Sequence, residues 1–183
     1  MEIKIKTRTV LNILLVISWI IFIGICIETG GFLFNAIFAL ANPDVVPRLW
    51  QQVDLSALLK FDNGYYFVFT LIMAIVSAVK AWIFFLIIKI LHDKNFNFSS
   101  PFSITVQRFI FLLSYISLLI GFFSVMGLKY AELLTEKGVA LPDTRYLKIG
   151  GADVWLFMAI ILFVIAQIFK RGIEIQTEND LTI

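Results

Sequence analysis

Cysteine and histidine are nearly absent from this chain of 183 residues, which contains only Cys26 and His92. One cysteine cannot form an internal disulfide, and these two residues do not make the Cys/His cluster of a structural zinc site. Charge is also sparse: the formal net charge is +2, and the basic residues are too scattered to predict direct nucleic-acid binding. The sequence therefore predicts no metal centre, no cofactor and no contact with nucleic acid.

Motifs for catalysis are missing as well. His92 belongs to no serine or cysteine nucleophile motif, and Glu132 and Glu136 lack the histidine three residues on that di-metal sites use. The glycine pairs Gly30-Gly31 and Gly150-Gly151 do not lie between a strand and a helix, as phosphate-binding glycines do, so they predict bends. We therefore expect that the protein is not an enzyme.

Hydrophobic residues are abundant: they make up 60% of the chain, against about 45–50% in soluble proteins. Four apolar runs, at about 10–30, 65–91, 103–127 and 153–170, are long enough to cross a bilayer as helices. The first run is too long for a secretion signal and has no small-residue cleavage site, so we expect it to remain a span. The sequence predicts an all-α, polytopic membrane protein that forms one domain over residues 1–183.

Two of the helices are expected to be longer than the bilayer is thick. The helical pattern continues from Val10 to Ala41, about 48 Å, and from the third span to Glu136 before Gly138. We therefore predict a four-helix transmembrane bundle whose first and third helices project beyond the outer face, unless the first helix bends at Gly30 and Gly31.

The distribution of Lys and Arg predicts the orientation. With the N-terminus inside, eight basic residues lie on inner segments and six on outer ones, and the inner charges lie closer to the helix ends. We expect a multi-pass protein of the bacterial inner (plasma) membrane, with both termini in the cytoplasm.

Small residues indicate where helices approach each other. Ala74, Ser77, Ala78 and Ala81 recur at helical spacing in the second span, and Gly121 offers close packing in the third. Ser100 followed by Pro101 predicts that the third helix starts near Pro101.

Lys80 is the most informative single residue, because a lysine within a span is costly and usually faces protein or water. Counted from the inner helix ends it is about 15 Å deep, close to the depths of Ser18, Ser114 and Tyr115. These four residues are the predicted ligand or switch site; the alternative is a structural or interface-reaching lysine. Glu28 differs from Lys80 by about 12 Å in depth, so we do not expect the two to pair.

The C-terminal tail is the predicted partner-binding segment. After the fourth span, apolar and polar residues alternate over 173–178, which predicts either a strand added to a partner's sheet or an extended, solvated tail. We expect residues 171–183 to form a cytoplasmic tail that binds a soluble partner together with the start of the third helix. The candidate residues are Pro101, Phe102, Ser103, Lys170, Arg171, Gly172, Glu174, Gln176, Glu178, Asn179, Asp180 and Leu181.

Two segments carry a family resemblance: SSPFSITVQRF before the third span and AQIFKRGIEIQTENDLTI at the end of the chain. Over nearly its whole length the chain resembles a family of bacterial four-span membrane proteins (domain of unknown function 2975), in its Bacteroidetes-type form. The pattern from Phe169 to Thr182 is the most specific part. Members are often encoded beside a small Cro/Xre-like helix-turn-helix regulator, so the resemblance implies a cytoplasmic regulator as partner. It implies no established activity.

The leading hypothesis is a regulatory or sensory membrane protein that acts with such a cytoplasmic helix-turn-helix regulator. One alternative is a small transporter or ligand-binding bundle that uses Lys80 and Tyr115 within the membrane. Another is a structural membrane subunit that associates through the small-residue face of the second span. A polar cavity that reaches Lys80 would favour ligand binding.

Overall fold

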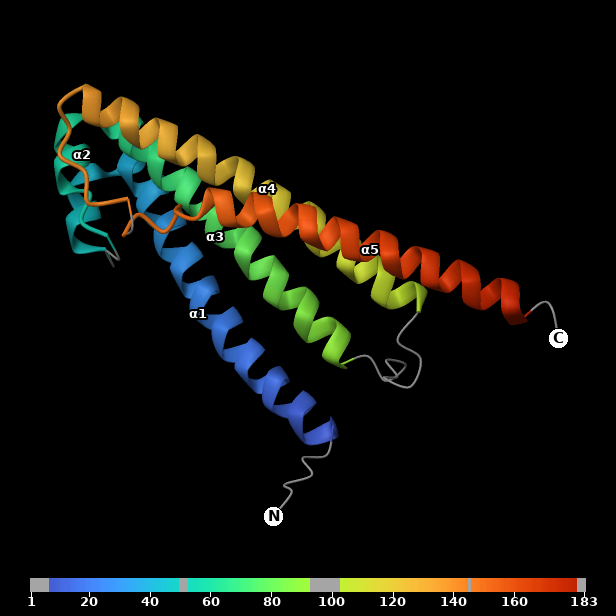
Figure 1. The fold of residues 1–183 in the computed structure, drawn as a ribbon. Helices are drawn as coiled ribbons and strands as arrows, with labels where there is room; N and C mark the ends of the chain where they lie inside the picture. Colours follow the sequence, from blue (N-terminus) through green and yellow to red (C-terminus); the bar gives the residue numbers. More distant parts are fainter. Residues whose placement is uncertain (1–6, 50–52, 93–102, 145, 181–183) are drawn as a thin grey trace, which may run out of the picture.

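A computed structural model describes residues 7–49, 53–92, 103–144 and 146–180, and these residues contain helices but no strands. The elements are the long helices α1 (Thr7–Ala41), α3 (Asn63–His92), α4 (Ile104–Glu136) and α5 (Ala152–Asp180), with the short helices η1 (Pro43–Arg48) and α2 (Ser56–Phe61) (Figure 1). The predicted all-α fold with four long apolar helices is confirmed.

Each of the four long helices can cross a membrane by its length and composition. They have 29 to 35 residues, whereas about 20 apolar residues span the hydrocarbon layer. In the most apolar stretch of α3, 50% of the residues are buried, but in that of α1 only 6% are. The chain is therefore a multi-pass membrane protein in which α3 is the central helix and most side chains of α1 face lipid.

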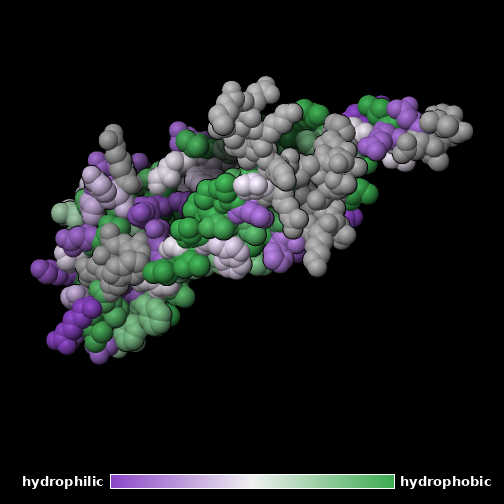
Figure 2. Space-filling model, turned by 90° about the horizontal axis from the view of Figure 1, so that it is seen from below, coloured by the Kyte–Doolittle hydropathy of each residue, from purple (hydrophilic) through white to green (hydrophobic). Residues whose placement is uncertain are grey.

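The helices form two pairs, α1 with α3 and α4 with α5. Contacts between α3 and α4 join the two pairs. In Figure 1 the helices lie close together at the end that carries α2 and diverge towards the end that carries both termini. We call these the cap end and the terminal end. Figure 2 shows hydrophilic residues gathered at the cap end and along the last turns of α5, with hydrophobic residues between them.

Local sequence signals fix both ends of α4. Ser103 is the N-cap, and its side chain accepts a hydrogen bond from the N–H of Val106 at 3.3 Å. The predicted start at Pro101 lies outside the described residues, and the cap is Ser103 and not Ser100. At the other end Gly138 has φ +85°, and the N–H of Val139 donates to the carbonyl of Leu134 at 3.1 Å, which makes a Schellman motif.

The core extends into the cap end, where the long helices meet α2 and the connections. The fully buried residues there are Leu58, Phe69 and Leu134, together with Leu147 and Ile149 of the connection before α5. The parts of α1 and α4 beyond the length of a membrane span thus help to build a packed cap, since their apolar residues cover one another.

One local prediction fails. Residues 173–178 are not a strand or an extended segment, because α5 continues as a helix to Asp180. Gly172 costs a helix only about 1 kcal/mol relative to alanine, and Arg171 pairs with Glu174 one turn later, Nη1 to Oε2, at 3.0 Å. The predicted continuation of the first helix to Ala41 is confirmed, because α1 runs unbroken through Gly30 and Gly31.

Candidate functional site

The ammonium group of Lys80 leaves the helix bundle and contacts the connection between α4 and α5. Its Nζ donates a hydrogen bond to the backbone carbonyl of Lys148 at 2.9 Å. The same Nζ lies 5.9 Å from the centre of a ring of Trp155, in the first turn of α5, close enough for a cation–π contact. Lys80 thus links α3 to the connection and to the start of α5.

Glu28 of α1 links the same region from the other side. One carboxylate oxygen, Oε1, accepts a hydrogen bond from the hydroxyl of Ser77 at 3.0 Å, and Oε2 lies 3.6 Å from Nζ of Lys148. Ser77 is fully buried, and the Glu28 side chain is 22% exposed. A hydrogen bond to a charged acceptor typically contributes about 1.5–3 kcal/mol, so Glu28 is a strong contact between α1, α3 and the connection.

Lys148 has a left-handed backbone conformation, with φ +60°, that is uncommon for a residue with a side chain. Such a conformation costs about 1–3 kcal/mol and persists where surrounding contacts impose it. Those contacts are present: Leu147 and Ile149 on either side are fully buried. Gly127 of α4 makes room for Ile149, because a Cβ there would lie 2.9 Å from Cδ1 of Ile149.

A cleft of about 480 Å³, which we call the cap-end cleft, opens beside these contacts, where the connection that comes from the cap end reaches the start of α5. This volume is within the usual range of ligand sites, about 300–1,000 Å³. Its described lining residues include two lysines and no carboxylate, and one of these lysines, Lys148, pairs with Glu28 at 3.6 Å. A site of this charge favours a small anion. The lining residues are Lys80, Leu128, Thr144, Lys148, Gly150 and Gly151.

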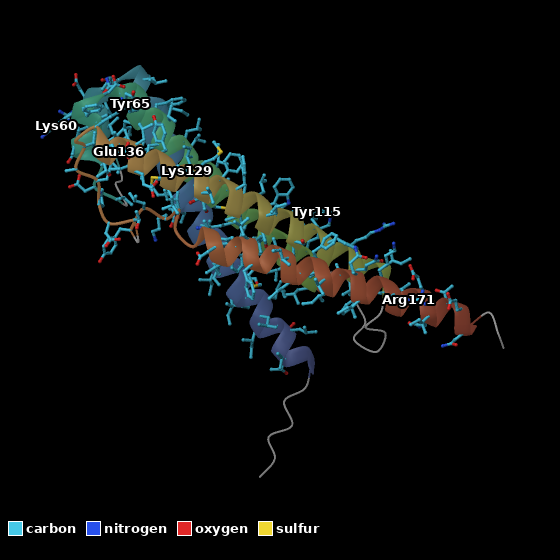
Figure 3. All side chains as sticks on the ribbon, turned by 45° about the horizontal axis from the view of Figure 1, so that its top comes forward. Lys60, Tyr65, Tyr115, Lys129, Glu136 and Arg171 are labelled. Atoms are coloured by element: carbon cyan, nitrogen blue, oxygen red, sulfur yellow. The ribbon has the colours of Figure 1, made fainter. Side chains whose placement is uncertain are left out.

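The structure does not assemble the ligand site predicted around Lys80. Ser18 donates its hydroxyl hydrogen bond to Leu14 in its own helix, and Ser114 donates its own to the carbonyl of Ala159 in α5, each at 2.8 Å. Tyr115 is 57% exposed on the outside of α4, well away from the cap end in Figure 3. Of the four predicted residues, only Lys80 belongs to the cleft.

The predicted depths were wrong because they assumed that the inner ends of the helices are level. The hydroxyl of Ser77 donates to Glu28, and the tilted rings of Phe22 and Phe85 have centres 6.3 Å apart, which fixes the antiparallel register of α1 and α3. In this register Lys80 lies only one turn, about 4.5 Å along the axis, from the level of Glu28. The predicted depth difference of about 12 Å is therefore wrong, although Glu28 pairs with Lys148 and Lys80 bonds to the Lys148 carbonyl, so these contacts do not join Glu28 directly to Lys80.

The predicted partner-binding residues are divided between described and undescribed parts of the chain. Ser103 caps α4, and Lys170 to Asp180 form the last turns of α5 (Arg171 is labelled in Figure 3). Five of them are exposed: Lys170, Arg171, Gln176, Glu178 and Asn179. Pro101, Phe102 and Leu181 lie outside the described residues. The predicted tail surface is therefore one end of a helix.

Comparisons with protein-family models, with curated proteins and with solved structures found no match. The family resemblance and the regulator that it implies stay predictions. Within the described ranges, no three His, Cys, Asp or Glu residues lie close enough together to hold a metal ion. The cleft and the helices that meet there are therefore the features that bear on function.

Proposed function

We propose that this chain is a sensory membrane protein that binds a small anion in the cap-end cleft and signals to a cytoplasmic partner at the terminal end. The observation that carries the proposal is the state of Lys148. Its backbone is strained, its carbonyl accepts from Lys80 of α3, and its ammonium group pairs with Glu28 of α1. Strain of this kind is concentrated at ligand and switch sites.

The charges of the cleft suggest how a ligand acts. Lys148 is 49% exposed, so a carboxylate or a similar anion can reach its ammonium group from outside. An anion bound there competes with Glu28 for the same cation. Ligand binding would therefore loosen the contact of α1 with the connection while Ser77 still holds Glu28 on α3.

The helix α5 can carry this change to the terminal end. The N–H of Trp155 donates to the carbonyl of Gly151 at 3.0 Å, so the connection runs directly into the first turn of α5. From there α5 is one continuous helix to Asp180. A small movement of a rigid helix at one end produces a comparable shift at the other, as in many switching proteins.

The proposed partner is the Cro/Xre-like helix-turn-helix regulator that the family resemblance implies. In the predicted orientation the last turns of α5 lie in the cytoplasm, in a bacterial plasma membrane. The exposed Lys170, Arg171, Gln176 and Glu178 on these turns support a docking surface for a soluble protein.

Ligand binding can be tested by thermal unfolding of the full chain in detergent. Sodium acetate, succinate, phosphate and sulfate are compared with sodium chloride at equal ionic strength. A ligand at a hundred times its Kd stabilises by about 2.7 kcal/mol, which raises the Tm of a chain of this size by about 5–11 °C. The rise should saturate, disappear in Lys148→Gln and persist in the exposed control Lys129→Gln. Equal responses in the two variants would refute the cleft as the site.

Partner binding is tested separately by co-purification of the proposed helix-turn-helix regulator with the full chain and with a chain that ends at Gly172. The truncation removes the last turns of α5 and leaves the cleft intact. We expect recovery with the full chain only. Equal recovery with both chains would remove the docking role of these turns without affecting the ligand result.

A transport function is the second candidate, because the cleft does reach Lys80. It is distinguished by reconstituting the protein in vesicles and measuring uptake of the anion that stabilises it. A sensor binds this anion without moving it, whereas a transporter gives uptake that Lys80→Gln abolishes.

A further inference from the structure

A second cavity lies at the opposite end of the bundle, between α3 and α4. It has a volume of about 180 Å³, and all its described lining residues belong to these two helices. In Figure 1 this is the region where α3 and the start of α4 have separated. Its lining residues are Leu86, Lys89, Ile90, Thr105, Arg108, Phe109 and Leu112.

The lining is divided into a charged part and an apolar part. Lys89 and Arg108 each present a cation from a different helix, and both are exposed. Thr105, in the first turn of α4, adds a hydroxyl. Leu86, Phe109 and Leu112 continue the cavity with apolar side chains along the transmembrane direction. The combination matches an amphipathic ligand with an anionic head and a hydrocarbon body.

Among the described residues, the carboxylates on the packed helices are too far away to neutralise these cations. Glu28 lies opposite Ser77, and Lys89 is twelve residues further along α3, about 18 Å away. On α5, Phe163 packs on Phe111, so Arg108 is level with about residue 166, some 12 Å short of Glu174. Both separations exceed the Debye length of about 8 Å in physiological salt.

We propose that this cavity binds the headgroup of an anionic phospholipid, with the acyl chains lying in the gap between α3 and α4. The two cations come from the end of α3 and the second turn of α4, the ends of two membrane-spanning helices, where lipid headgroups lie. Basic pockets between transmembrane helices recognise phosphate headgroups through charge. The lipid completes the bundle at the end where its helices diverge, independently of the ligand proposed for the cap end.

The test is native mass spectrometry of the full-length protein in mild detergent, titrated with phosphatidylglycerol or with phosphatidylcholine. Wild-type protein should bind one phosphatidylglycerol in clear preference to phosphatidylcholine, and rising salt should reduce the preference. The double variant Lys89→Gln/Arg108→Gln should lose about 30-fold in affinity for phosphatidylglycerol, because each basic residue contributes about 1 kcal/mol beside anionic lipid.

The matched control is Lys60→Gln/Lys129→Gln, which removes two exposed charges elsewhere, Lys60 at the cap end and Lys129 on α4 (Figure 3). It should keep the wild-type affinity. A loss as large as that of the first variant would mean that total charge, and not the cavity, attracts the lipid. If the first variant misfolds, the variant Lys89→Arg/Arg108→Lys, which keeps both charges, is tested in its place. The proposal requires that it bind phosphatidylglycerol with near-wild-type affinity. Absence of any preference in the wild-type protein would overturn it outright.

Discussion

The close approach of α4 and α5 at Gly121 predicts that a glycine-to-alanine change there lowers stability. The same change at an open position of the chain serves as the control. A Cβ added to Gly121 would lie 2.7 Å from Cδ2 of Leu156, 2.8 Å from its Cγ and 3.3 Å from its backbone nitrogen. The side chain of Leu156 can turn aside, but the backbone contact moves only if the helices separate. Gly121→Ala should therefore force a repacking of the two helices.

The size of the effect follows from two opposing terms. Overpacking a tight contact costs about 1–3 kcal/mol, while replacing glycine by alanine within a helix gains up to about 1 kcal/mol. The net destabilisation is up to about 2 kcal/mol, or a fall in Tm of up to about 8 °C for a chain of this length. Gly24→Ala is the matched control, because a Cβ there meets nothing within 4 Å, and it should raise the Tm.

The assay is thermal unfolding of the purified variants in one detergent, followed by far-ultraviolet circular dichroism. Adding Leu156→Ala to Gly121→Ala should relieve the clash, so the two changes together cost less than the sum of their separate effects. If Gly121→Ala raises the Tm as Gly24→Ala does, the contact between α4 and α5 is not as close as described and the reasoning is refuted.

Further predictions concern polar contacts. Glu28→Gln keeps a hydrogen bond from Ser77 but loses the charge, so it should destabilise by about 1 kcal/mol in denaturant titrations, and Glu28→Ala by more, because a buried hydroxyl loses its partner. Ser114→Ala should lower the free energy of unfolding by only about 0.6 kcal/mol in the same titration, the average for interhelical hydrogen bonds in membranes. A loss above about 2 kcal/mol would contradict this. Hydrogen bonds from the hydroxyl and then the N–H of Ser56 lower the pKa of Asp54. The wild type should thus be more stable than Asp54→Asn at neutral pH, with the gap closing as the pH falls below the ordinary aspartate range.

Composition and periodicity were sufficient for the architecture. Four apolar runs predicted the four long helices. Within a bilayer the backbone N–H and C=O groups must bond to each other, and an apolar segment satisfies them by forming a helix. Gly138 signalled the end of α4, and Gly121 a close helix contact, because only glycine suits those positions. The helical end of α5 was missed, because alternation over six residues is a weak signal beside the continuation of an existing helix.

The site was only partly visible in the sequence. Lys80 was identified because a charge inside a span is costly, and this depends on the residue alone. Its partners depend on the register between α1 and α3 and on the path of the connection before α5, which no local pattern specifies. Only the tertiary structure brings Glu28, Lys80 and Lys148 together, since packing of Leu147 and Ile149 into the cap decides where the connection lies. The sequence by itself determined which segments cross the membrane; the packing of the cap determined which charges meet there.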